Sequence, residues 1–154
     1  MKFIVILTLA LAVVACGGTN ESDTETQADA EAPQTSEETS TEWMHDDLEG
    51  ALALAAETGK PVFIDMYADW CGPCRMLADD YFTRDDYMEV LSDCILVKIN
   101  IGDHEEMAAR YSVQSVPTLI LMDQEGTELD RITGVMGSPE EFLPVIRDFV
   151  AQGL

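Results

Sequence analysis

The sequence predicts one α/β domain, residues 43–154, in which a mixed β-sheet is covered by helices on both faces. Three observations predict it. Apolar runs of strand length alternate with segments of helical periodicity. A turn motif joins two of the strands as a hairpin. The length of 154 residues suits one domain plus targeting and linker segments. The expected order is helix, strand, helix, helix, strand, helix, strand, strand, helix, and such an order places helices against both faces of a sheet.

Residues 1–15 are interpreted as a signal peptide. A single early charge, Lys2, precedes an apolar run over residues 3–14 that is too short to span a bilayer comfortably. The run ends in Val-Val-Ala-Cys-Gly at residues 13–17, which resembles the lipobox of bacterial lipoproteins. The resemblance implies that Cys16 carries lipid and anchors an exported protein to the cell envelope, with its domain facing the oxidising periplasm or exterior. An ordinary cleaved signal with an incidental cysteine is the alternative.

Residues 16–42 are predicted to combine the lipidated cysteine with a disordered acidic linker. Residues 17–42 include eight acidic side chains and no basic or aromatic one. A segment of this composition cannot bury a core and repels itself, so it suits an extended spacer. Recruitment of a basic partner by the acidic run is the alternative.

The charge of the chain argues against two classes of partner. The formal net charge is −22, whereas a nucleic-acid-binding protein needs clustered Lys and Arg to neutralise phosphates. Attachment to anionic lipid through a polybasic segment is equally disfavoured. We therefore expect no nucleic-acid partner, and membrane attachment through the lipid on Cys16.

The first half of the domain contains two predicted strands. Helical periodicity from Leu48 to Ala55 ends at Gly59. Residues 62–68 form an apolar run with β-branched and aromatic members, which is typical of a central strand covered on both faces. Helical spacing resumes after the cysteines and continues in a second short helix over residues 85–92. Residues 94–100 follow as the next strand.

The second half closes the sheet and ends in a helix. Residues 104–111 are typical of a short amphipathic helix, and residues 119–122 of a strand. Asp-Gln-Glu-Gly at 123–126 is a hairpin turn, so residues 128–133 return as the partner strand. Ser138 then supplies a helix cap ahead of a first-turn proline and two acids.

The chemistry lies in Trp70-Cys71-Gly72-Pro73-Cys74, between a strand and a helix. The two cysteines stand one helical turn apart and can close and reopen a small disulfide. A helix N-terminus favours the thiolate of Cys71, which is the expected nucleophile. Cys74 is then the resolving thiol that attacks Cys71 and releases the reduced substrate. Pro73 fits the first helical turn and stiffens the ring.

A metal half-site or a permanent disulfide is the alternative reading of the two cysteines. A metal site would need a further cysteine or histidine pair at ligand spacing, and His45 and His104 are isolated in the sequence. We therefore expect no metal, and no cofactor other than the redox-active disulfide itself.

Residues 65–74, together with Val116-Pro117-Thr118, resemble thioredoxins, and the resemblance covers residues 43–154. More narrowly, residues 59–62 and 67–71 resemble the C-terminal domain of DsbD-type thiol:disulfide interchange proteins. The resemblance implies the thioredoxin fold and thiol–disulfide exchange. The Gly72-Pro73 pair departs from the DsbD-type domains and matches cytoplasmic thioredoxin, so the redox partner is left open.

Asp65 is a charged residue within an apolar strand run, which is costly unless its proton is used or a partner satisfies it. The resemblance implies that Asp65 is a buried base near Cys74, with a raised pKa. The alternative is a strand-edge aspartate facing solvent. Lys98 resembles the lysine that tunes this carboxyl, although an alternating strand lysine also suits a solvated face.

Pro117 resembles the cis-proline that faces the dithiol across a substrate groove, with a trans turn as the alternative. A cis bond here would leave the backbone of Val116 free to pair with an extended substrate, and Trp70 would form the apolar rim of the groove beside Gly72 and Pro73. Cys94 opens a strand and is expected to be a buried free thiol, with a regulatory thiol as the alternative.

The predicted function is reduction of protein disulfides outside the cytoplasm. Gly72-Pro73 matches the reducing thioredoxin type, for which about −270 mV is typical. Continuous reduction there needs electrons from a membrane donor, for which we expect a transporter of the DsbD or CcdA type. We expect a monomer. An oxidase or isomerase would share every catalytic residue, and a tethered binding or chaperone module with a vestigial dithiol is the non-enzymatic alternative.

Overall fold

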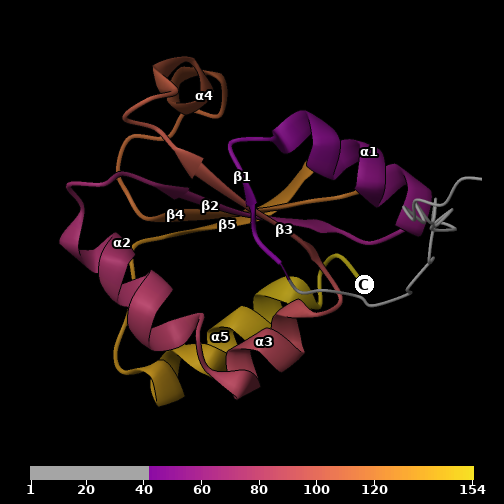
Figure 1. Ribbon diagram of the computed structural model, residues 1–154. Helices are drawn as coiled ribbons and strands as arrows, with labels where there is room; N and C mark the ends of the chain where they lie inside the picture. Colours follow the sequence, from indigo (N-terminus) through magenta and orange to yellow (C-terminus); the bar gives the residue numbers. More distant parts are fainter. Residues whose placement is uncertain (1–41) are drawn as a thin grey trace, which may run out of the picture. The chain divides into compact units, whose positions relative to one another are not determined.

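The computed structural model describes residues 42–154 (Figure 1). The predicted signal peptide, Cys16 and almost all of the predicted acidic linker lie outside these residues, so they stay predictions. No helix within residues 42–154 is long and apolar enough to cross a membrane.

The element order agrees with the prediction except at two places. The strands are β1 (Met44–His45), β2 (Val62–Tyr67), β3 (Ile95–Asn100), β4 (Thr118–Met122) and β5 (Glu128–Thr133). The helices are α1 (Leu48–Thr58), α2 (Gly72–Met76), the π-helical turn η1 (Leu77–Tyr81), α3 (Asp85–Leu91), α4 (Glu105–Arg110) and α5 (Pro139–Val150). The sequence predicted neither the short strand β1 nor the π-helical geometry of η1.

The strands form one mixed sheet in the order β1-β3-β2-β4-β5. β3 runs parallel to both β1 and β2, whereas β4 runs antiparallel to β2 and β5. Figure 1 shows α1 and α4 on one side of the sheet and α2, α3 and α5 on the other. The predicted mixed sheet with helices on both faces is confirmed, and β2 is its central strand.

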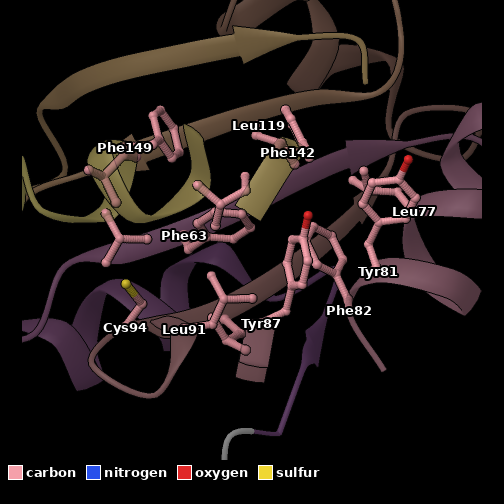
Figure 2. Close-up of a cluster of buried hydrophobic side chains, with 14 residues drawn as sticks. Phe63, Leu77, Tyr81, Phe82, Tyr87, Leu91, Cys94, Leu119, Phe142 and Phe149 are labelled. Carbon is pink, nitrogen blue, oxygen red and sulfur yellow. The ribbon is translucent and has the colours of Figure 1, made fainter. Parts of the chain in front are cut away.

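One side of the sheet, which we call the aromatic face, carries a large ring cluster beneath α2, α3 and α5. Phe63 of β2 contacts Trp43, Phe82 and Phe149 with ring centroids about 6 Å apart in edge-to-face geometry. Figure 2 shows Phe63 in the middle of this cluster. Its buried members are Phe63, Leu77, Tyr81, Phe82, Tyr87, Leu91, Cys94, Leu96, Leu119, Leu121, Phe142, Ile146, Phe149 and Val150.

The opposite side, which we call the aliphatic face, packs against α1. Asp47 caps the N-terminus of this helix, and its carboxylate accepts a 2.8 Å hydrogen bond from the N–H of Gly50. Gly59 caps the C-terminus, with a φ of 72° that suits glycine. Small side chains on α1 let it approach the sheet closely. The buried members of this face are Leu48, Ala51, Ala55, Val62, Ile64, Met66, Val97, Ile99, Ile120 and Met122.

The helix that follows the cysteines widens after one turn. The N–H of Phe82 donates to the carbonyl of Leu77 at 2.9 Å, an i to i+5 bond that defines the π-turn. This geometry buries Leu77, Tyr81 and Phe82 together. The π-turn therefore packs the end of the helix that follows the cysteines against the aromatic cluster.

Candidate functional site: a dithiol beside a buried carboxyl

Cys71 and Cys74 form a disulfide at the start of α2. Their sulfurs are 2.07 Å apart and their Cα atoms 5.3 Å apart. Cys71 is the N-cap residue, and its Sγ accepts a 3.1 Å hydrogen bond from the backbone N–H of Cys74. Because this N–H is aimed at the sulfur, it would stabilise negative charge on Cys71 after reduction. Pro73 lies in the first helical turn, where a missing N–H removes no intrahelical bond.

Trp70 and the Val116–Pro117 segment flank the disulfide. The indole of Trp70 is 74% exposed. The Val116–Pro117 peptide bond is cis, and Val116 packs against the cluster that contains both cysteines. Pro117 accepts a 2.8 Å bond from the N–H of Gly134, but within residues 42–154 no hydrogen bond uses the backbone N–H or C=O of Val116. Free backbone groups beside the dithiol can therefore pair with an extended chain.

Asp65 lies in the central strand and is 1% exposed. The alternative of an edge position facing solvent is therefore wrong. Its Oδ1 is buried and has no hydrogen-bond partner within the described residues. Burial raises the pKa of Asp65 to about 7, and the positive charge of Lys98 offsets part of that rise. A carboxyl with this pKa can accept and return a proton near neutral pH.

Asp65 and Cys74 line a common cavity of about 250 Å³. Cys74 and Asp65 line it from α2 and β2, and Lys98 lines it from β3. The other lining residues are His45, Tyr67, Ala68, Asp69, Arg75, Ala78 and Asp79. The structure therefore brings together the predicted base and the predicted resolving thiol.

The comparisons with known proteins agree with this geometry. A family model described as a thioredoxin-like domain matches residues 48–150. The chain belongs to the thioredoxin-like family. Thioredoxin from Chlamydia caviae is 42% identical over 74 residues, which are 48% of this chain and 69% of that protein.

A second curated relative and a solved structure extend the likeness. The thiol:disulfide interchange protein DsbD of Cronobacter sakazakii is 34% identical over 100 residues, and the match covers 61% of this chain but only 17% of DsbD. The solution structure of a Thermus thermophilus thioredoxin superposes with a TM-score of 0.61 at 23% identity, over 72% of this chain and 88% of that one. The structural likeness confirms the thioredoxin fold.

Lys98 in this thioredoxin-like protein lies next to Asp65, as the resemblance implies. The two residues are in register on neighbouring strands. The Nζ of Lys98 lies 4.7 Å from the ring centroid of Trp43 and 6.0 Å from that of Phe82. The ammonium is therefore held against aromatic rings by cation–π attraction rather than extending freely into water.

Asn100 is a site residue that the sequence analysis missed. Its side chain is buried at the end of β3 and donates to the carboxylates of Asp69 at 3.2 Å and Asp103 at 2.7 Å. The guanidinium of Arg75 holds the same loop, because it donates to the carbonyl of Asp69 at 2.8 Å. These bonds fix the loop immediately before Trp70. An asparagine at the end of a strand was the available signal, but it equally suits a turn.

The sequence has two further cysteines. Cys16 lies outside the described residues. Cys94 is a buried free thiol, as expected, and burial raises its pKa to about 12, which keeps it protonated and unreactive. Within residues 42–154, His, Cys, Asp and Glu side chains form no group of three or more suited to a metal ion.

Proposed function

We propose that this protein is a membrane-tethered, extracytoplasmic thiol–disulfide oxidoreductase that reduces protein disulfides through Cys71 and Cys74. The observation that carries the proposal is the Cys71–Cys74 pair, which lies at disulfide distance at the start of α2 in a thioredoxin fold. This arrangement supports thiol–disulfide exchange. The direction of exchange and the tether are the proposed parts.

The reaction follows from the placement of the two sulfurs. The Cys71 thiolate attacks a substrate disulfide, so that one substrate sulfur leaves as a thiolate and the other is bound in a mixed disulfide. Cys74 gives its proton to Asp65 and attacks Cys71. The Cys71–Cys74 disulfide forms, the mixed disulfide breaks, and the second substrate sulfur leaves as a thiolate. Two electrons have passed from the protein to the substrate.

The surface beside the dithiol suits an extended segment of a protein substrate. The unpaired backbone N–H and C=O of Val116 can form strand-like hydrogen bonds with such a segment. The exposed indole of Trp70, next to Gly72 and Pro73, offers apolar contact at the rim. Specificity would thus come from an accessible backbone near the target disulfide rather than from a deep pocket.

The reducing direction and the tether rest on two sequence features. The Gly72-Pro73 pair matches reducing thioredoxins, and the lipobox-like segment that ends at Cys16 supports export and lipid attachment. A reductant in an oxidising compartment needs a membrane electron donor, for which we propose a transporter of the DsbD or CcdA type. The likeness to DsbD supports partners that exchange thiols with this chain.

The direction is tested by equilibrating the protein with glutathione buffers. A potential near −270 mV is expected for a reductase, and a value well above the thioredoxin range would favour an oxidase or isomerase. In insulin reduction, Cys71→Ser is expected to abolish activity, whereas Cys94→Ala, the matched control, retains it. Unchanged reduction by Cys71→Ser would favour the non-enzymatic binding module.

Substrates and donor are tested by trapping. A full-length Cys74→Ala protein, expressed in cells, cannot resolve its mixed disulfides and should hold partners on Cys71. Cys16→Ala in the same experiment should lose incorporated lipid and shift to the soluble fraction. The absence of any thiol-linked partner would contradict the exchange reaction, and lipid-independent membrane association would contradict the tether.

A further inference from the structure

A row of titratable side chains crosses the sheet from its edge to its centre. His45 of β1 lies in register with Lys98 of β3, and Lys98 lies in register with Asp65 of β2. Partners on neighbouring strands point to the same face and stand about 4.8 Å apart. The three side chains therefore stand side by side on the aromatic face, over about 10 Å from first to last.

The same three residues line one cavity together with Cys74. At about 30 Å³ of liquid volume for each molecule, the cavity of about 250 Å³ has room for several waters. Its inner end holds the buried carboxyl of Asp65, with one oxygen that lacks a protein partner. His45 is exposed at the edge of the sheet. The lining of this cavity therefore extends from Cys74 and the buried carboxyl of Asp65 to the exposed imidazole of His45.

His45 is the group on this path suited to both accepting and returning a proton, because a neutral imidazole carries an acceptor on one ring nitrogen and a donor on the other. Lysine and arginine side chains act only as hydrogen-bond donors, and ionised carboxylates act only as acceptors. Burial raises the pKa of Tyr67 above its usual value near 10, so its hydroxyl stays protonated. The charged groups facing the cavity besides Asp65 are Lys98 on β3, Arg75 on α2, Asp69 in the preceding loop and Asp79 on η1.

We propose that His45 is a proton relay between solvent and the cavity at Asp65, an inference that rests on the proposed dithiol exchange. During resolution the Cys74 proton passes to Asp65, then through the cavity to one ring nitrogen of His45, while the other nitrogen releases a proton to the buffer. Re-reduction of the disulfide runs the same path inward. No electrons move in these steps, and one proton leaves the protein for each resolving attack.

The test compares the two histidines of the chain. His45→Gln removes the relay, whereas His104→Gln is the matched control, because His104 caps α4 near Asp46 and Glu106 and does not line the cavity. In dilute buffer, single-turnover mixing should show that His45→Gln forms the mixed disulfide at the wild-type rate. The same variant should resolve the mixed disulfide about 10-fold more slowly. This is a small effect for proton transfer, because water still carries some protons. Added imidazole should restore the rate. His104→Gln should match the wild type.

In the kinetic experiment, two outcomes would overturn the relay. One is wild-type resolution by His45→Gln in dilute buffer, and the other is slow resolution that added imidazole does not restore, which would indicate a structural role. A second readout is independent of substrate reduction: NMR of the Asp65 carboxyl carbon in the oxidised protein should show slower proton exchange in His45→Gln. Failure of the wild type to form a mixed disulfide would contradict the proposed function, whereas unchanged Asp65 exchange would contradict the relay alone.

Discussion

The two faces of the central sheet are made by the same strands, yet the buried side chains of one are apolar, whereas the other also holds the buried carboxyl of Asp65. On β2, Val62, Ile64 and Met66 point to the aliphatic face, whereas Phe63 and Asp65 point to the aromatic face. Neighbours along a strand face opposite ways, so adjacent residues belong to different environments. A charged group placed at one position of β2 therefore leaves the packing beneath α1 untouched.

The packing of the aromatic face excludes water from the carboxyl of Asp65, and this burial disfavours its charged form and raises its pKa. Phe63 lies two residues before Asp65 on the same face of β2. Its ring contacts three aromatic rings from other parts of the chain. Trp43 contacts both Phe63 and the ammonium of Lys98. The comparison teaches that aromatic residues which stabilise the fold also position the ammonium of Lys98, whose charge offsets part of the rise that burial causes in the pKa of Asp65.

The largest expected effect comes from removing the centre of the aromatic face. Phe63→Ala should lower the free energy of unfolding by about 3–5 kcal/mol, because it removes three ring contacts and leaves a cavity. Denaturant unfolding measures it. Phe63→Leu, which keeps most of the volume, is the control and should cost less than about 1.5 kcal/mol. Equal costs for both variants would show that the rings have no special role.

The second prediction tests the ionisation of Asp65 separately from the packing around it. The pKa of Asp65 is raised from 3.8 to about 7 on folding, so the unfolded state ionises first as pH rises. The contribution of Asp65 to the free energy of unfolding should therefore be largest below about pH 4 and fall by up to roughly 4 kcal/mol between pH 4 and 7. Asp65→Asn should remove this loss and slow resolution more than initial attack.

The control for this pH dependence is Asp148→Asn, which changes an exposed aspartate on α5. Its unfolding profile between pH 4 and 7 should follow that of the wild type. If Asp65→Asn kept the full pH dependence, or if both thiol steps slowed equally, Asp65 would not be the base for Cys74.

A smaller effect tests the contact between the ammonium and the carboxyl. Lys98→Met removes the positive charge that lowers the pKa of Asp65, so that pKa should rise above about 7. The pH midpoint of resolution, measured by rapid mixing, should move upward with it. Lys98→Arg should leave the midpoint near its wild-type position, and a downward shift in Lys98→Met would contradict the assignment.

The smallest effect is expected on the aliphatic face. Ile64→Val removes one methylene next to Asp65 in sequence but on the other side of the sheet. It should cost about 1 kcal/mol of stability and leave both rates of thiol exchange unchanged. A change in the resolution rate would show that the two faces are coupled through the strand, contrary to the comparison.

The parts of the fold that follow from local pattern could be predicted from the sequence. The apolar run at residues 62–68 identified the central strand, and the turn at 123–126 identified the β4–β5 hairpin. β1 was missed because two residues carry no measurable periodicity. η1 was missed because the buried residues Leu77, Tyr81 and Phe82 suit the spacing of an α-helix as well as that of a π-turn.

Some residues of the site could also be predicted from local sequence, whereas others could not. The cysteines were predictable from their spacing, and Asp65 from a charge within an apolar run. The nearness of His45 to Asp65 was not, because it depends on the registers of β1 and β2 against β3, whose Lys98 lies 53 residues after His45 and 33 residues after Asp65. The hydrogen bonds of Asn100 could not be predicted for the same reason. Its partners Asp69 and Asp103 lie in two loops that come together only in the folded sheet.

The two tryptophans of the chain differ in their exposure to water, so their fluorescence can report on two parts of the molecule. Trp70 stands in water beside the disulfide, whereas Trp43 is half-buried under the ammonium of Lys98. Because water relaxes around an excited indole and lowers its emission energy, Trp70 should emit at longer wavelength than Trp43. Substrate docking and proton movement at Asp65 would then appear in separate parts of one fluorescence spectrum.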